Sequence, residues 1–164
     1  ADVPFGIGSG SGVIFGVTGG VTEAVLRRLQ QGHNRVDMES IKKSGVRGDD
    51  GIKVLTYNYN GREIKAAVVN GLANADKVLQ QIKNHEAEYD FVEVMACRRG
   101  CIMGGGQPVN AGPRTRKARM KGLYDTDVNT QIKKSNENPM ILSLYDTLLK
   151  GKEHELLHRN FSGK

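Results

Sequence analysis

The most constraining feature of this chain is an apolar run, residues 89–96, that leads directly into a turn rich in cysteine and glycine. The run has the β-branched and aromatic composition of a strand. Cys97, Cys101 and the glycines at positions 104–106 follow it. Thiolates are soft ligands suited to iron-sulfur clusters, and glycines let backbone N–H groups approach a cluster closely. The pattern predicts half of a cluster site, because a 4Fe-4S cluster normally takes four cysteines and this sequence holds two.

Two further predicted strands, residues 52–59 and 62–69, lie upstream and flank the dipeptide Asn60-Gly61. Asn-Gly favours a two-residue type I′ turn, so we expect an antiparallel β-hairpin here. A helix over residues 74–84 then separates the hairpin from the cysteine-bearing strand. The helix is predicted because apolar side chains recur at helical spacing on one face. These are Ala75, Val78, Leu79 and Ile82.

A strand, a helix and a strand in succession predict a right-handed βαβ crossover with parallel pairing. The cysteine turn then lies at the carboxyl end of a strand, where α/β sheets place their ligands. Glycine-rich residues 1–20 predict a loop packed closely near a cofactor, and apolar spacing predicts a helix over residues 21–30. Neither a Gly-x-Gly-x-x-Gly pattern nor a phosphate-loop lysine accompanies these glycines, which disfavours nucleotide binding.

Beyond Pro108 the chain becomes polar, and helices are expected over residues 128–136 and from Pro139 to residue 149. Asn138 suits the N-cap of the second one. The fold class is therefore α/β: a mixed sheet with a βαβ unit and a β-hairpin, flanked by helices and a C-terminal helical wrap. The length of 164 residues suits a single domain. We expect an α/β part over residues 1–112 and a helical tail over residues 113–164.

The net charge of +6 points to an acidic partner or to solubility. Much of the excess lies in Arg98, Arg99 and residues 114–121, and we interpret the last of these as a solvated helix face. A basic nucleic-acid-binding module is an alternative, although no aromatic residue interrupts this run to form a base-stacking platform. Two nearby cysteines do not form a disulfide framework, so a reducing cytoplasm is the expected compartment, and no apolar run suggests a membrane span.

Residues 93–108 resemble the last cysteine motif of the iron-only (FeFe) hydrogenases, Glu-x-Met-Ala-Cys-x-x-Gly-Cys-x-x-Gly-Gly-Gly-Gln-Pro, at every fixed position. The segments from Asp2 to Gly6 and from Gly12 to Ala24 resemble earlier parts of the same family. The resemblance extends to Phe161 and identifies the chain as the C-terminal half of the catalytic domain. It implies a first half with two more cysteine motifs outside this chain, so the chain alone should be inactive.

In that family the two matching cysteines ligate the 4Fe-4S part of the H-cluster. The resemblance therefore implies a metal-ligand role for Cys97, and for Cys101 a second role as the bridge to a two-iron subcluster bearing carbon monoxide and cyanide. Met95 would contact the two-iron unit, and Phe15 and Gly16 would line its pocket. The implied reaction is the reversible conversion of two protons and two electrons to dihydrogen. The implied partners are the missing half of the domain, or a companion chain, and a redox partner such as ferredoxin or a nicotinamide-linked subunit.

Arg98 and Arg99 depart from the family, which usually has proline and glycine at these positions. If residue 99 needs a left-handed backbone, arginine there costs about 1 kcal/mol. Two positive charges beside an anionic cluster should also raise its reduction potential. A non-catalytic iron-sulfur assembly or sensor relative of the hydrogenases is therefore an alternative. Surface arginines that contact only solvent are an equally open interpretation.

His154-Glu155-Leu-Leu-His158 matches the zinc-protease signature His-Glu-x-x-His. The motif is short and arises easily by chance. It also resembles the usual ending of iron hydrogenases, where it forms a structural helix. We therefore expect a structural helix here.

Overall fold

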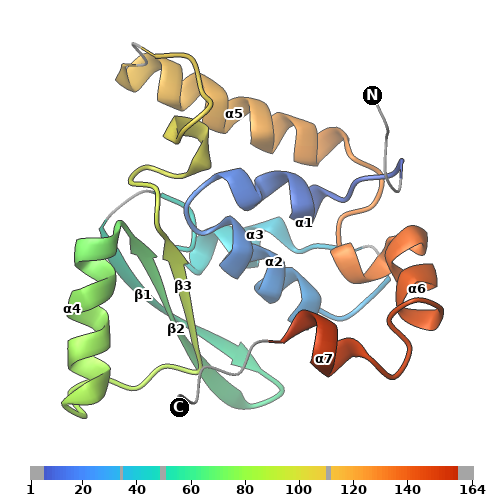
Figure 1. Cartoon of the computed structure of the whole chain (residues 1–164), viewed down its shortest axis with the longest axis horizontal. Helices are drawn as coiled ribbons and strands as arrows, with labels where there is room; N and C mark the ends of the chain where they lie inside the picture. The colour runs from blue at the N-terminus through green and yellow to red at the C-terminus, as the bar shows by residue number, and fades with distance from the viewer. Residues whose placement is uncertain (1–5, 34, 49–50, 110–111, 159–164) are drawn as a thin grey trace.

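The protein contains a three-stranded mixed sheet with helices on both of its faces (Figure 1). The computed structural model describes residues 6–33, 35–48, 51–109 and 112–158. The strands are β1 (Ile52–Tyr59), β2 (Arg62–Asn70) and β3 (Phe91–Met95), in that spatial order. β1 pairs antiparallel with β2, and β2 pairs parallel with β3. The predicted mixed α/β architecture is confirmed.

The hairpin between β1 and β2 forms as predicted at Asn60 and Gly61. Their φ angles are 52° and 80°, and a type I′ turn requires positive φ at both positions. The Gly61 N–H also donates a hydrogen bond to Asn58 Oδ1 at 3.1 Å. This turn fixes the register in which Tyr59 pairs with Arg62.

Helix α4 (Leu72–Lys83) connects β2 to β3 and completes the predicted βαβ unit. Ala75 and Val78 are buried against one face of the sheet. Leu79 and Ile82, which were predicted to share that face, are 61% and 37% exposed. Leu79 lies at the edge of the buried stripe, and Ile82 lies about one turn beyond the last buried residue.

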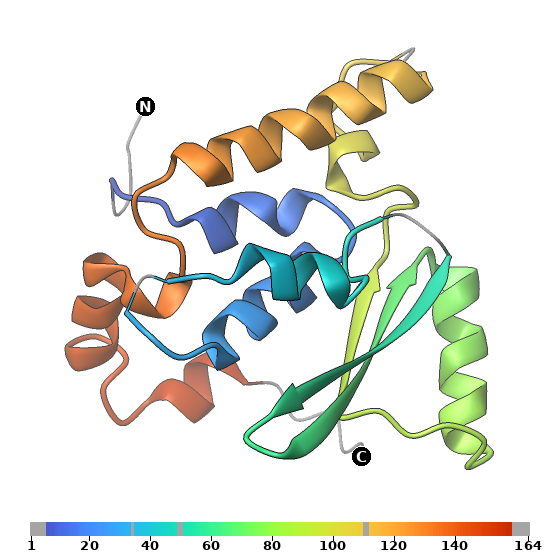
Figure 2. The ribbon, with the colours of Figure 1, turned by 180° about the vertical axis from the view of Figure 1, so that it is seen from behind.

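The other face of the sheet is covered by α2 (Gly20–Leu29) and α3 (Met38–Lys43), as Figure 2 shows from behind. The buried members of this core come from the two helices, the segment after α3, and the inward-facing positions of β1 and β2. They are Leu26, Ile41, Val46, Leu55, Ala66 and Val68. The helix predicted over residues 21–30 is therefore confirmed to within a residue at each end.

The expectation of a loop through residue 20 is wrong in part. Helix α1 (Gly10–Val13) and the 3₁₀ turn η1 (Ile14–Gly16) lie within it. A Cβ on Gly10 would lie 2.1 Å from Asp127 Oδ1, so any larger residue there would displace this carboxylate. Packing against the C-terminal part of the chain thus stabilises a helical turn that glycine disfavours intrinsically.

The C-terminal segment, residues 113–158, contains α5 (Pro113–Asn129), the 3₁₀ turn η3 (Ser135–Glu137), α6 (Pro139–Asp146) and α7 (Glu153–Leu157). The helix predicted over residues 128–136 is wrong. There the backbone leaves α5 and pairs with the start of α1: Gly10 N–H donates to Ile132 O at 2.8 Å, and Ser11 N–H to Lys133 O at 3.1 Å.

Helix α6 begins as predicted, because Asn138 Oδ1 accepts a hydrogen bond from Met140 N–H. It ends at Asp146, three residues earlier than expected. The segment from Asp2 to Phe5 and the residue Phe161, both part of the family resemblance, lie outside the described residues. Among the described residues, no helix is long and apolar enough to cross a membrane.

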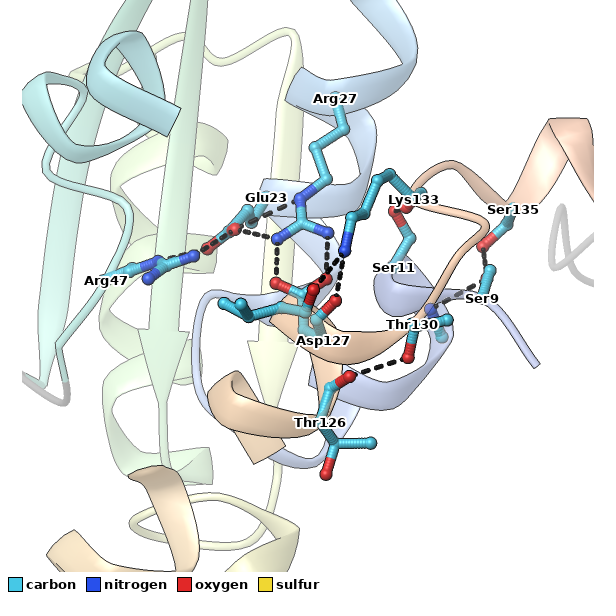
Figure 3. Close-up of polar contacts among 12 residues, drawn as sticks. Ser9, Ser11, Glu23, Arg27, Arg47, Thr126, Asp127, Thr130, Lys133 and Ser135 are labelled. Atoms are coloured by element: carbon cyan, nitrogen blue, oxygen red, sulfur yellow. Dashed lines mark hydrogen bonds and ion pairs between the residues drawn. The ribbon is translucent and has the colours of Figure 1, made fainter. Parts of the chain in front are cut away.

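A buried ion-pair network joins α2 to α5 (Figure 3). The Arg27 guanidinium donates to both carboxylate oxygens of Asp127, each at 2.7 Å, and to Glu23 Oε1 at 2.6 Å. Arg27 and Glu23 are fully buried, and Asp127 is 3% exposed. Arg47 donates to both oxygens of Glu23 and stacks over the Tyr124 ring, with 4.0 Å from Cζ to the ring centroid.

The opposite charges in this network stabilise the Arg27 guanidinium. Burial lowers the pKa of Arg27, but the hydrogen bonds to Asp127 and the charge of Glu23 more than offset that effect, so the pKa lies above its ordinary value. Burial, together with the charge of Glu23, raises the pKa of Tyr124 to about 12. The network therefore stabilises the charged form of the buried Arg27 guanidinium.

Replacing Asp127 tests this network. Asp127→Asn keeps the shape of the side chain but leaves a buried arginine charge incompletely paired, which should lower the free energy of unfolding by about 3–5 kcal/mol. Urea unfolding followed by circular dichroism measures the change. Asp125→Asn is the matched control on the same helix, because Asp125 pairs with Lys121 at the surface and its loss should matter little. Equal losses for the two variants would contradict the assignment.

Candidate metal centre

Both cysteines lie at the carboxyl end of β3, as predicted. The cysteine loop, residues 97–108, opens with a turn in which Gly100 N–H donates to Cys97 O at 3.0 Å. The 3₁₀ turn η2 (Cys101–Met103) follows, and Gly104 N–H donates to Cys101 O at 3.0 Å. Both thiols are free and exposed. The loop therefore presents two exposed soft ligands on a locally hydrogen-bonded frame.

Two glycines of the loop lie where there is little or no room for a side chain. Gly100 has a φ of 84°, and a Cβ there would lie 2.9 Å from Gly16 O. A Cβ on Gly104 would lie 3.1 Å from the Cys97 sulfur. The first glycine lets the loop pack against the segment before α2, and the second keeps space open beside a thiol.

Arg99 has a φ of 73°, the left-handed conformation that glycine adopts most readily. Asn70, at the end of β2, holds this backbone in place, because its Oδ1 accepts a hydrogen bond from Arg99 N–H at 2.9 Å. The Arg98 and Arg99 side chains are exposed. Residue 99 thus has the left-handed backbone conformation in which arginine is less favourable than glycine.

Met95 is the last residue of β3 and is 7% exposed. Its thioether sulfur lies 3.8 Å from the Cys101 sulfur. The strand ends at Met95, two residues before Cys97, so strand alternation does not orient the Cys97 side chain. The structure instead joins Met95 to Cys101, the residue to which the resemblance assigns the bridging role.

Phe15 and Gly16 form part of η1, which lies next to the loop. The Gly16 carbonyl oxygen packs against Gly100 of the cysteine loop. A Cβ on Gly16 would lie 2.8 Å from Leu123 Cδ1 of α5. The Phe15 ring is 43% exposed. Of the two predicted pocket residues, Gly16 is therefore in contact with the cysteine loop, and Phe15 lies beside it on the exposed side of the turn.

Glu93 was not singled out from the sequence, although it is the first residue of the matched motif. It is 5% exposed, and its carboxylate accepts hydrogen bonds from Gly19 N–H at 2.8 Å and from Thr22 N–H and Oγ1 at 2.7 and 2.6 Å. Glu93 thus caps the N-terminus of α2, where Gly19 has no side chain to do so. A carboxylate within an apolar strand was the signal that could have revealed it.

The basic run on α5 is only partly the solvated face that was predicted. Arg114, Lys117 and Lys121 are exposed, whereas Arg116 and Arg119 are half-buried. Arg119 turns inward and donates to a backbone carbonyl of the cysteine loop. Part of the positive charge therefore faces the site and not the solvent.

The donor set fits half of a thiolate-bound cluster. Within the described residues, no group of three or more histidine, cysteine, aspartate or glutamate side chains is placed to hold a metal ion. Cys97 and Cys101 supply two exposed thiols, and Gly104 leaves room beside one of them. A cluster that takes four thiolates would need two more from another polypeptide segment.

The histidine pair does not form a zinc-protease site in the described part of the chain. His154 and His158 lie with their Nδ1 atoms 2.7 Å apart and are exposed on and just beyond α7. A third protein ligand, which such sites require, is absent among the described residues. A structural role for this helix remains our prediction.

The backbone of residue 99 gives a stability test. Arg99→Gly should raise the free energy of unfolding by up to about 1 kcal/mol, because glycine adopts a positive φ without strain. Arg98→Gly is the matched control, since Arg98 has no positive φ and gains only unfolded-state freedom, so it should lower stability. Chemical denaturation of the three proteins measures both effects, and two changes of the same sign would refute the strain assignment.

Comparison with known proteins identifies the family. Residues 1–105 match the C-terminal domain of the iron-only hydrogenase large subunit, and residues 113–164 match the iron hydrogenase small subunit. Iron hydrogenase 1 of Clostridium pasteurianum is 38% identical over 96% of this chain and 29% of its own length. The NADP-reducing hydrogenase subunit HndD of Solidesulfovibrio fructosivorans is also 38% identical, over 98% of this chain and 28% of its own.

Solved structures agree with the sequence matches. HydA1, the [FeFe]-hydrogenase of Chlamydomonas reinhardtii, superimposes with a TM-score of 0.62 at 35% identity, over 97% of this chain and 48% of the HydA1 chain. A probable cytosolic Fe-S cluster assembly factor of Aedes aegypti is more distant, at 27% identity over 88% of this chain. The chain thus spans less than half the length of these relatives. It belongs to the iron-only hydrogenase family and corresponds to the C-terminal region of that family's proteins.

Proposed function

We propose that this chain supplies Cys97 and Cys101 as two of the four thiolate ligands of the 4Fe-4S part of an H-cluster, with Cys101 also bridging to the two-iron subcluster. The whole protein would then catalyse the reversible oxidation of dihydrogen to two protons and two electrons. The observation that carries the proposal is the placement of both exposed thiols on one loop, with the Met95 sulfur 3.8 Å from the Cys101 sulfur.

When bound, the cluster with its carbon monoxide and cyanide ligands would supply the metal centre at which dihydrogen is split. The residues of this chain would ligate and shield it. Met95 offers a polarizable thioether beside the bridging thiolate, which suits contact with the two-iron unit. Phe15 and Gly16 would line the pocket next to the loop, with the aromatic ring restricting access of water and oxygen.

The other two ligands would come from the preceding half of the catalytic domain or from a companion chain. The 48% coverage of HydA1 supports this arrangement, since a comparable length of that protein has no counterpart here. A redox partner such as ferredoxin or a nicotinamide-linked subunit would exchange electrons, and the name of the NADP-reducing relative favours the second type. Two free thiols suit a reducing cytoplasm, which remains a prediction.

Reconstitution tests the shared site. This chain alone, treated anaerobically with iron and sulfide, should not hold a stable 4Fe-4S cluster in a one-to-one ratio, because only two cysteines are present. Adding the segment that carries the remaining cysteine motifs should restore the cluster, and Cys97→Ser or Cys101→Ser should abolish it. Iron and sulfide analysis with electron paramagnetic resonance gives the readout. A stoichiometric cluster on the isolated monomer, without added thiol, would sink the proposal.

The same preparation separates the alternatives. An iron-free monomer that binds DNA would support a basic nucleic-acid-binding module. A protein that assembles the complete cluster but does not turn over hydrogen would support the assembly or sensor relative. Arg98 and Arg99 favour this second candidate, because they place two charges where the hydrogenase motif usually has none.

The arginine pair can be tested by electrochemistry. Replacing Arg98 with Pro and Arg99 with Gly in the assembled enzyme should lower the cluster potential and shift the catalytic bias toward proton reduction, because positive charge favours the reduced cluster. Protein-film voltammetry measures both. Removing two exposed charges from α4, with Lys77→Gln and Lys83→Gln, is the control for net charge. An unchanged potential would show that the arginines are screened surface residues and would leave the sensor alternative without its main support.

A further inference from the structure

We infer that Arg119 of α5 is a positioning residue for the cysteine loop. Its guanidinium donates hydrogen bonds to two backbone carbonyls of the loop, and we call this pair of contacts the clamp. The inference rests on the proposed function insofar as Cys101 is a cluster ligand. The contacts are direct: Arg119 Nη1 donates to Ile102 O at 2.7 Å, and Nη2 donates to Pro108 O at 3.4 Å. Nη1 also lies 3.9 Å from the Met103 sulfur.

The two carbonyls lie on either side of the glycine triplet at positions 104–106. Glycines at 105 and 106 have no atoms close to where a Cβ would be, so packing does not restrain this stretch. Glycine also has the largest backbone freedom to lose on ordering. A planar guanidinium with several fixed donors can bind both ends of such a segment at once, which a lysine ammonium cannot do with the same geometry.

The first of these carbonyls belongs to the residue directly after Cys101. Ile102 is 7% exposed and packs with Ile14 and Val17, and the partly buried Leu123 of α5 joins the same cluster. On the other side of Cys101, Asn70 holds the backbone of Arg99 from the sheet. Cys101 is therefore held between two anchors, one from β2 and one from α5.

The hydrogen bond from Arg119 to Ile102 joins two parts of the chain that match different family models. The cysteines lie in the part that matches the large subunit, and Arg119 lies in the part that matches the small subunit. The small-subunit-like segment would thus act on the metal site through one side chain. This gives it a role at the centre in addition to its role in stability.

Backbone hydrogen exchange in the complete chain tests the clamp without any cluster. The Met103 and Gly104 amides donate to Gly100 O and Cys101 O within the loop, so their exchange reports its opening. Arg119→Ala should speed exchange at both amides by about fivefold, the change expected from losing one ordinary hydrogen bond. Arg119→Lys should give an intermediate rate. Arg114→Ala, an exposed arginine of the same helix, is the matched control and should leave both rates unchanged.

Equal exchange rates in Arg119→Ala and Arg114→Ala would overturn the clamp. If Arg119→Ala also accelerates exchange throughout the sheet, the variant is destabilised as a whole, and Arg119→Lys is then compared with the unsubstituted protein. Faster exchange confined to the loop in that variant supports the clamp, and unchanged exchange refutes it.

A second readout uses the assembled enzyme. Loss of the clamp should broaden the electron paramagnetic resonance signal of the cluster in Arg119→Ala but not in Arg114→Ala, because the ligand at position 101 would sample more positions. An unbroadened signal would refute the effect on the ligand. Failure to assemble any cluster with the unsubstituted chain would refute the proposed function instead, and the exchange measurements would still decide whether Arg119 holds the loop.

Discussion

The buried pairing of Arg27 with Asp127 is the constraint on which the rest of this structure depends. A guanidinium removed from water is tolerable only when carboxylates surround it, and here one carboxylate comes from the same helix and the other from a residue one hundred positions later in the chain. Helix α2 therefore reaches its buried position only when α5 is docked. Gly10 belongs to the same constraint, because any side chain there would displace Asp127.

Docking of α5 in turn shapes the metal centre. Leu123 and Met120 of that helix pack on the cluster of Ile14, Val17 and Ile102, which places η1 against the cysteine loop. From the sheet side, Glu93 ties β3 to the start of α2 with three hydrogen bonds. The loop that bears the thiols thus has little freedom of its own at its ends. The position of the cysteine loop therefore depends on residues from both the large-subunit-like and the small-subunit-like parts of the chain.

The sequence allowed the sheet to be predicted because its signals are local. Asn60-Gly61 specifies its own turn, and apolar runs of strand length specify β2 and β3. The cysteine loop could be placed for the same reason, since it follows a strand directly. The two segments whose secondary structure was predicted wrongly, residues 1–20 and 128–136, share one physical cause. In both segments, contacts with a distant part of the chain, such as the bond from Gly10 N–H to Ile132 O, decide the conformation against local preference. Arg119 and Glu93 were missed as site-supporting residues because their partners are set by tertiary packing.

The cysteine loop and the helix that packs on it are joined by a short stretch of the same chain, between Pro108 and Gly112. Covalent linkage of this kind gives two interacting surfaces an effective concentration on the order of millimolar. Contacts that would be too weak to hold two separate molecules together can therefore remain formed almost all the time. The same surfaces carried on separate polypeptides would need a larger or more apolar interface to reach equal occupancy.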